Sequence, residues 1–345
     1  MLQYLSPSLV ASSRVSRSKC TCNVFRSMTS RHRKCRCILC LLIVTSISVL
    51  CSVILVNIWR LWVGDSTCHT QIDTGLDLTH VEFPRRIHQC FFGVDSLKMP
   101  ARFGRAKYVW SKEYSLKFGY NYTLWNAGMV ERLIRNDYPW LVPTYSSYGH
   151  WVRRVDAAKY AILHKYGGIY VDLDIRTSGK DLYGIFSKLS NRTSMIMYKT
   201  QPAGVGGDFL IAKPGDPFLW YILCGLLSAN TWWLLPYLTT MMSTGPGYLT
   251  VRERTFKRRD TLHLLTSREL DPYIRHIRGS TWHQLDGQVI WWAFSHIDKI
   301  ICYTAVVFMV VICLFILKLL LKYSRKHQYV QQLVTSRCHR IRYCK

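Results

Sequence analysis

Two long uncharged runs constrain this chain more than any other feature of its sequence. Residues 37–59 form a stretch of 23 residues without a charge, and residues 300–317 form another of 18. A helix that crosses a bilayer needs about 20 mostly apolar residues. The sequence therefore predicts transmembrane helices at 38–59 and 300–320. The first run is too long, and lies too far along the chain, for a plain signal peptide, and no small-residue cleavage site follows it.

The charges are distributed unevenly around these runs. The net charge is +26, yet residues 1–37 and 318–345 each carry eight Lys or Arg and no acid, whereas all 20 acidic residues lie between Asp65 and Asp298. Basic segments next to membrane spans stay in the cytosol. We therefore expect two basic cytosolic tails, at 1–37 and 321–345, and a lumenal part between the spans. Basic tails beside apolar runs favour a membrane protein over a nucleic-acid-binding protein.

The expected lumenal part holds two sequons and few cysteines. Asn121 and Asn191 each begin an Asn-x-Thr sequon, the acceptor sequence for N-glycosylation. Of the 13 cysteines, Cys68, Cys90 and Cys224 lie in this part. That number does not make a disulfide framework, and it allows one bridge with one free thiol.

Strand and helix patterns alternate along the lumenal part after a polar stalk at 60–82. Strands are expected at 86–92, 120–125 and 169–171, and helices at 105–118, 129–136 and 152–165. Gly167-Gly168 ends the last of these helices, because glycine adopts the left-handed conformation of a helix C-terminus without steric cost. The alternation predicts an α/β domain over 83–295 with a mainly parallel sheet, whose ligands bind at the carboxyl ends of the strands.

The strongest chemical signal follows the last of these strands. The apolar strand Ile169–Val171 leads directly into two carboxylates, Asp172 and Asp174. Carboxylate oxygens suit Mg²⁺ or Mn²⁺, and such an ion neutralises a diphosphate leaving group. An Asp-x-Asp pair alone is a weak motif, but the preceding Gly-Gly-Ile-Tyr makes it far more specific. The segment therefore predicts a metal site that could hold a diphosphate.

The string from Arg154 to Asp174 resembles the sugar-binding, Asp-x-Asp region of glycosyltransferase family 32. The resemblance extends over roughly residues 83–295. It includes blocks at 84–89, 122–125, 204–209, 243–249 and 279–286. The last block and the second apolar run are most similar to the inositol phosphorylceramide mannosyltransferases of that family. The resemblance implies a GT-A-like domain and a metal-dependent, retaining reaction.

The resemblance also implies roles for individual residues. Asp156, Asp172 and Asp174 are expected to be catalytic. The implied metal ligands are Asp174, Asp172 and Asp286. The implied donor-binding residues are Asp156, Lys159, Tyr170, Asp172, Trp125 and His283. Ordinary packing remains an alternative for Trp125, Tyr170 and His283, as does a helix-surface salt bridge with Arg153 or Lys159 for Asp156. The family usually has arginine where Lys159 stands, and a more polar pair where Gly206-Gly207 stands.

As a function, the resemblance implies transfer of mannose from GDP-mannose to the head group of inositol phosphorylceramide, a membrane lipid acceptor. A Golgi or ER–Golgi membrane and a small regulatory subunit are expected with it. Two alternatives stay open. One is a hexosyltransferase acting on another glycolipid or glycan, for example by α-1,6-mannosyl or α-1,4-galactosyl transfer. The other is a non-catalytic scaffold or regulator of a glycosyltransferase.

Two further interpretations concern single segments. A phosphotransferase with Asp172 as nucleophile needs Thr or Val where Arg176 stands, which argues against that class. A basic cluster would attract an acceptor with a phosphodiester head group to the protein near the bilayer. The candidate cluster consists of Arg252, Arg254, Lys257, Arg258 and Arg259. A solvated charged loop is the alternative for this segment.

Overall fold

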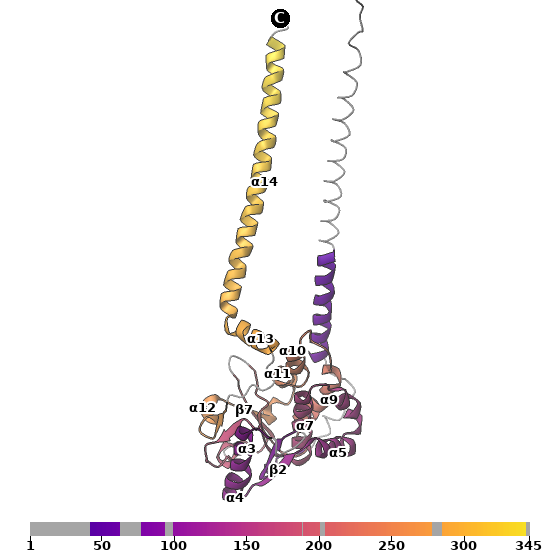
Figure 1. Ribbon diagram of the computed structural model, residues 1–345, viewed down its shortest axis with the longest axis vertical. Coiled ribbons are helices and arrows are strands. Elements are labelled where there is room, and N and C mark those ends of the chain that lie inside the picture. The colour runs from indigo at the N-terminus through magenta and orange to yellow at the C-terminus, as the bar shows by residue number, and fades with distance from the viewer. Residues whose placement is uncertain are drawn as a thin grey trace, which may run out of the picture. The chain divides into compact units, whose positions relative to one another are not determined.

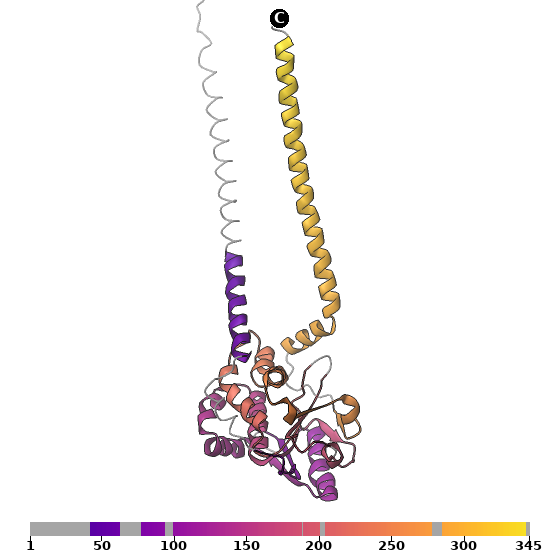
Figure 2. The ribbon, with the colours of Figure 1, turned by 180° about the vertical axis from the view of Figure 1, so that it is seen from behind.

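The computed structural model describes residues 42–62, 77–93, 99–187, 189–200, 204–277 and 285–342. The chain divides into two compact units, with the boundary after residue 279. The first unit holds one long apolar helix and an α/β domain, and the second unit holds two helices (Figures 1 and 2).

A six-stranded sheet forms the centre of the α/β domain. Its strands are β1 (Arg86–Cys90), β2 (Asn121–Trp125), β3 (Gly168–Val171), β5 (Met195–Tyr198), β6 (Phe209–Ala212) and β7 (Leu262–Leu265). They lie in the order β2-β1-β3-β6-β5-β7. β6 runs antiparallel to β3 and β5, whereas the β1–β2, β1–β3 and β5–β7 pairs are parallel. This confirms the expected mainly parallel sheet. A separate antiparallel pair joins β4 (Ile175–Thr177) to β8 (Ile274–His276).

Helices cover both faces of the sheet (Figure 1). One face packs against α5 (Ala127–Asp137), α7 (Trp151–Tyr166), α9 (Pro217–Ala229) and α11 (Pro246–Thr255). The other face packs against α8 (Tyr183–Phe186), α12 (Ser267–Leu270) and the run of α3 (Ala101–Tyr108), η3 (Val109–Tyr114) and α4 (Ser115–Phe118). Along β3 the side chains alternate, so that Tyr170 joins the first core while Ile169 and Val171 join the second. Shorter helical segments are η4 (Pro139–Leu141), α6 (Val142–Ser147), α10 (Pro236–Ser243) and η5 (Arg259–Thr261).

The helices expected at 129–136 and 152–165 are confirmed as α5 and α7. The helix expected at 105–118 begins earlier, at Ala101, and contains the π-helical segment η3 in its middle. Both the backbone N–H and the hydroxyl of Ser115 donate to the carbonyl of Trp110, five residues before it, and this spacing defines the π turn. The Trp110 side chain is fully buried and its indole N–H donates to the carbonyl of Ile175 at 2.9 Å.

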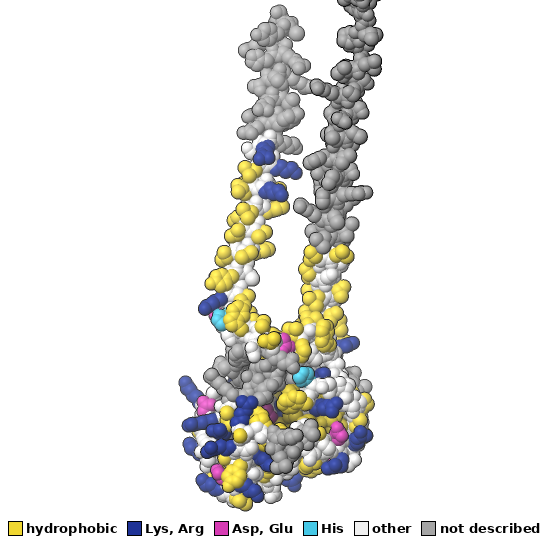
Figure 3. All heavy atoms as spheres, viewed as in Figure 1, with side chains coloured by type: hydrophobic (Ala, Val, Ile, Leu, Met, Phe, Trp, Pro, Cys, Tyr) yellow, Lys and Arg dark blue, Asp and Glu magenta, His cyan; other side chains and the backbone are white. Residues whose placement is uncertain are grey.

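Both expected membrane spans are helices long and apolar enough to cross a bilayer. The first runs from Leu42 to Trp62, and its most apolar 18 residues have a mean hydropathy of 2.3. In the second unit, α13 (Leu285–Ser295) precedes α14 (Ile297–Arg342), and the most apolar 18 residues within 297–325 have a mean hydropathy of 3.0. Hydrophobic side chains cover the visible faces of both spans, whereas Lys and Arg are spread over the α/β domain (Figure 3).

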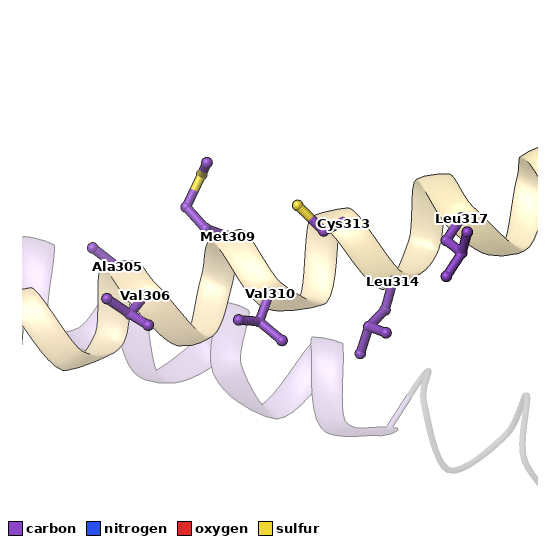
Figure 4. A pocket seen from close by; sticks show the side chains of 7 residues that line it. All are labelled: Ala305, Val306, Met309, Val310, Cys313, Leu314 and Leu317. Atoms are coloured by element: carbon purple, nitrogen blue, oxygen red, sulfur yellow. The ribbon is translucent and has the colours of Figure 1, made fainter.

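One apolar hollow runs along α14, lined by seven side chains from Ala305 to Leu317 (Figure 4). All of these side chains come from one helix, and most of them are highly exposed. Exposed apolar side chains that surround a helix are expected where it faces lipid. The hollow therefore belongs to the surface of a candidate span, and it is not a ligand site.

The thiols agree with one bridge and one free cysteine. Cys224 on α9 is disulfide-bonded, and Cys90 at the end of β1 is a free, buried thiol. Cys68 lies outside the described residues.

Candidate active site

The two aspartates lie in a turn that the surrounding strands hold from two sides. β3 ends at Val171, and the N–H of Ile175 donates to the carbonyl of Asp172 at 3.1 Å. The N–H of Asp172 donates to the carbonyl of Asp208 at 2.8 Å. On the other side, the carbonyl of Asp174 accepts from the N–H of Ile277 at 2.7 Å. The turn is therefore fixed to the start of β6 and to the end of β8.

Two glycines allow α7 to pass directly into β3. Gly167 and Gly168 have φ angles of 60° and 96°, which side chains rarely tolerate. A Cβ on Gly168 would lie 2.6 Å from the carbonyl oxygen of Arg86, and one on Gly167 would lie 2.6 Å from Cδ of Pro214. The close approach of Gly168 to β1 and of Gly167 to Pro214 thus explains the glycine pair that precedes the aspartates.

The carboxyl groups in this turn are partly buried and close to other negative charges. Burial is the main cause that raises the pKa of Asp172 to about 8, and Asp174 and Asp208 raise it further against the opposing Lys159. Burial and Asp208 raise the pKa of Asp174 to about 6. The Tyr170 hydroxyl donates to Oδ1 of Asp172 at 2.7 Å. Like charges held together in a low-dielectric site favour the binding of a cation.

Asp156 and Lys159 form a buried ion pair on the face of α7 that meets the sheet. Nζ of Lys159 donates to Oδ1 of Asp156 at 2.6 Å, and the Thr244 hydroxyl donates to Oδ2 at 3.1 Å. Both charged residues are buried, so the pair is not the helix-surface salt bridge of the alternative interpretation. Burial alone lowers the pKa of Lys159, but the carboxylates of Asp156 and Asp172 outweigh it and raise this pKa. Lys159 therefore interacts with both the Asp156 carboxylate and the aspartate turn.

A third carboxylate, Asp208, adjoins the turn and was not singled out from the sequence. The Tyr198 hydroxyl donates to Oδ1 of Asp208 at 2.5 Å, and Nε2 of His276 lies 3.4 Å from Oδ2. Asp208 is at this place because β6 is antiparallel to β3, so the start of β6 meets the end of β3. His276 lies opposite Ile175 in the β4–β8 pair. The only sequence signal was that Asp208 lies in the block 204–209 that resembles the family.

The glycines that replace a more polar pair have steric reasons in this chain. A Cβ on Gly206 would lie 2.2 Å from the Tyr198 ring, and one on Gly207 would lie 3.1 Å from Nζ of Lys159. Gly206 thus leaves room for the tyrosine that holds Asp208. Gly207 leaves room for the lysine that holds Asp156.

Trp125 lies in the core beside the site. It is 7% exposed, packs against Tyr166 and donates its indole N–H to Nδ1 of His88 at 3.1 Å. Nε2 of His88 in turn lies 3.0 Å from the carbonyl of Gly167. Burial lowers the pKa of His88 to about 4, so the ring is neutral, donating from Nε2 and accepting at Nδ1. The contact of Trp125 with a nucleotide base stays a prediction.

The two remaining predicted site residues come from the last family block. His283 lies outside the described residues. Asp286 lies in α13 of the second unit, where its Oδ1 accepts from the N–H of Gly287 at 2.9 Å. Their participation in the site stays a prediction.

The donor set around the turn fits a hard divalent cation. Asp172 and Asp174 offer carboxylate oxygens. Within the described ranges, no group of three or more His, Cys, Asp and Glu side chains could hold a metal ion without other ligands. Mg²⁺ is commonly bound by one or two carboxylates together with substrate phosphates and water. The chemistry of these residues therefore fits an ion whose coordination a bound diphosphate would complete.

A hollow of about 600 Å³ is lined in part by the two residues that contact Asp208. These two residues are Tyr198 and His276, and Lys199 and Arg275 also line the hollow. Both of these cationic residues are exposed. The hollow provides open space for a substrate group beside Asp208, with more basic than acidic residues on its lining.

The expected basic cluster lies partly in α11 and partly after it, and one of its five members is not at the surface. Arg252 is 1% exposed, and its guanidinium lies over the rings of Tyr221 and Tyr248, at 4.8 and 5.3 Å from their centroids. Arg259 forms an ion pair with Glu253. The prediction is therefore wrong for Arg252, because its position on α11 faces α9 and not solvent.

Aspartates in the turn after a central strand, in a mainly parallel sheet covered by helices on both faces, fit the GT-A-like domain that the sequence predicts. The comparison with known families agrees with this class. Residues 104–181 match the family described as "Glycosyltransferase sugar-binding region containing DXD motif". This matched part of the chain contains α7, β3 and the aspartate turn.

The chain is similar to two proteins of yeasts. It is 32% identical over 236 residues to inositol phosphoceramide mannosyltransferase 2 of Schizosaccharomyces pombe, covering 63% of this chain and 64% of that protein. It is also 32% identical over 225 residues to mannosyl phosphorylinositol ceramide synthase SUR1 of Saccharomyces cerevisiae, covering 62% of this chain and 55% of that protein. The matched part thus spans less than two thirds of the length of these relatives.

Among solved structures, the glycosyltransferase PaToxG is similar over 56% of this chain and 78% of its own, with a TM-score of 0.37 and 13% sequence identity. A likeness at this level carries no inference.

Proposed function

We propose that this chain is a metal-dependent, retaining glycosyltransferase that transfers mannose from GDP-mannose to the head group of inositol phosphoceramide. The observation that carries the proposal is the aspartate turn with the Asp156–Lys159 pair buried beside it, inside the segment that matches the sugar-binding family. The names of the two fungal relatives support mannose as the sugar and inositol phosphoceramide as the acceptor.

In this proposal Asp172 and Asp174 hold Mn²⁺ or Mg²⁺ against the diphosphate. The ion supplies charge neutralisation for the leaving group. The Asp156 carboxylate, whose orientation Lys159 and Thr244 fix, accepts hydrogen bonds from hydroxyls of the donor sugar. Tyr170 orients the Asp172 carboxylate through their 2.7 Å hydrogen bond. Held groups of this kind act without reorganisation during the reaction.

The hollow beside Asp208 supports an acceptor that carries a phosphodiester. Lys199, Arg275 and His276 on its lining offer positive charge or hydrogen-bond donors to such a group. Arg275 also lies directly opposite Arg176 in the β4–β8 pair. Like charges opposite one another destabilise a strand pair, and an anion bound there would relieve that repulsion.

The proposed topology places the domain 83–295 in the lumen of a Golgi or ER–Golgi membrane, with both basic tails in the cytosol. Two helices of sufficient length and hydropathy support the two spans, and the basic residues outside them support the orientation. A small regulatory subunit is a further proposed partner.

Transfer of labelled mannose tests the proposal. Membranes containing the full chain are incubated with GDP-mannose and inositol phosphoceramide, with Mn²⁺ or with EDTA. We expect a metal-dependent mannosylated lipid with the α configuration, lost by at least a hundredfold in Asp174→Asn. The matched control is Asp260→Asn, which removes a carboxylate whose recorded contact is an exposed 3.6 Å ion pair with Arg192. It should transfer normally.

Other outcomes decide between the alternatives. Metal-dependent transfer from another nucleotide-sugar would keep the class of enzyme and overturn the donor. Transfer to a different glycolipid or glycan would overturn the acceptor. If a folded, membrane-bound chain transferred sugar from none of the donors, a scaffold or regulator would be favoured.

A further inference from the structure

We propose that residues 230–235, which connect α9 to α10, form a membrane-docking loop that places Trp232 in the lipid interface beside the end of the helix Leu42–Trp62. The occupant of this surface is the lipid bilayer. The proposal rests on the first membrane span and not on the transfer reaction, so the two can fail separately.

The loop is fixed to the helix at a defined level. Nδ2 of Asn57 donates to the carbonyl of Trp232 at 3.0 Å, and Asn57 is 6% exposed. One turn further on, Leu61 is 2% exposed and belongs to the hydrophobic core of the α/β domain. The last turns of the helix are therefore built into the domain. Asn57 precedes Arg60, the first charge after the uncharged run, by three residues, so Trp232 lies at the level where a span meets the bilayer surface.

The apolar side chains at this level point into solvent. Trp232 is 63% exposed and Leu235 is 38% exposed. On the helix, Trp59 and Trp62 are 63% and 53% exposed. Tryptophan is enriched where a membrane meets water, because its ring is apolar and its N–H is polar. These side chains continue the lipid-facing surface of the span onto the domain.

The loop is held in a conformation that separates its two tryptophans. Leu234 has a φ of 68°, a left-handed value that strains the backbone of a residue with a side chain of this size. Trp233 is 8% exposed and packs in the core, and its backbone N–H donates to the Thr239 hydroxyl at 2.9 Å. Asn230 accepts from Nη2 of Arg153 at 2.6 Å. Strain of this kind persists where it serves a purpose, and the purpose here is to turn Trp232 outward.

A lipid surface explains these features better than a protein partner. Residues 230–235 carry no charge that would select a partner, and the helix beside them exposes further apolar residues such as Leu55 and Ile58. A single exposed tryptophan on a protein surface needs no explanation. Trp232 differs, because a hydrogen bond from Asn57 to its backbone carbonyl fixes it beside the apolar helix.

The loop also connects the bilayer surface to the sugar-binding face. It leads into α10, which spans eight residues, and the next residue, Thr244, donates to Asp156. A helix of this length covers about 12 Å. Docking the loop would thus hold Asp156 near the bilayer surface, within reach of a lipid head group.

Site-specific photo-crosslinking in the full chain tests the docking. A benzophenone amino acid replaces Trp232, replaces Trp59 as the positive control, or replaces Leu116 as the negative control, since Leu116 on α4 is 78% exposed. α4 lies at the end of the domain away from the first helix (Figures 1 and 2). In vesicles of phosphatidylcholine and phosphatidylinositol we expect lipid adducts at 232 and 59 but not at 116.

Each other result overturns the proposal. Lipid adducts at 59 without any at 232 would show that the loop stays in water. A protein adduct at 232 would make the loop a protein interface. No lipid at either position would exclude the span itself.

Discussion

At the scale of residues, the buried Lys159–Asp156 pair gives the clearest prediction for stability, because removing one partner leaves the other as an unpaired buried charge. We expect Lys159→Met to destabilise the protein by about 3–5 kcal/mol, the cost of an uncompensated buried carboxylate. The measurement is the shift in the unfolding midpoint of the full chain in detergent.

The matched control for this change lies on the same helix. Lys165 of α7 forms an ion pair with Asp137, and its side chain is 45% exposed. Lys165→Met should change the midpoint little, since exposed ion pairs contribute little. Equal losses in the two variants would show that burial of the Lys159 pair has no special cost.

His88 predicts a dependence of stability on pH. Its pKa is lowered to about 4 from 6.5 in the folded protein. Between these values the unfolded chain binds a proton at His88 that the folded protein does not bind. Stability therefore falls as the pH falls from 6.5 to 4, by about 3 kcal/mol for this residue at most. Denaturant unfolding at several pH values in this range measures how steeply the free energy of unfolding depends on pH. This dependence should be weaker in His88→Gln, and an unchanged dependence would contradict the lowered pKa of His88.

At the scale of elements, the contact of α9 with α11 depends on one missing side chain. A Cβ on Gly225 would lie 2.1 Å from Nη2 of Arg252. Gly225→Ala should therefore displace the guanidinium from its tyrosines and destabilise the domain by about 1–3 kcal/mol. Gly104 in α3 is the control, because a Cβ there meets nothing within 4 Å. Gly104→Ala should stabilise the helix by about 0.5–1 kcal/mol, and thermal unfolding of both variants measures the difference.

Elements were predicted more accurately where their apolar pattern extends over more residues. α5 and α7 have apolar periodicity along their whole length, and their bounds were predicted to within two residues at each end. The start of α3 was missed because Arg102 and Gly104 interrupt the periodicity of its first turn. β4 and β8 are three residues each, too short for an alternating pattern to identify them.

At the scale of the whole molecule, N-glycosylation tests the orientation of the domain. Asn191 is exposed and lies in a turn before β5. If residues 60–299 are lumenal, a glycosidase should reduce the apparent mass of the chain expressed in a eukaryotic host. Asn191→Gln should remove part of that reduction, and the double variant with Asn121→Gln should remove all of it. A wild-type chain with no glycan at either sequon would place the domain on the cytosolic side.

The sequence alone determined the features that depend on neighbouring residues. These are the two apolar helices, the α/β alternation, and the segment from α7 through the glycine pair to Asp172 and Asp174, whose chemistry is local. The tertiary structure decided what depends on distant residues. It brought Asp208 and His276 to the aspartate turn and Thr244 to Asp156, buried Arg252, and set Trp232 against Asn57, 175 residues away. These contacts follow from the strand order and from helix packing, which bring together residues that no local pattern relates.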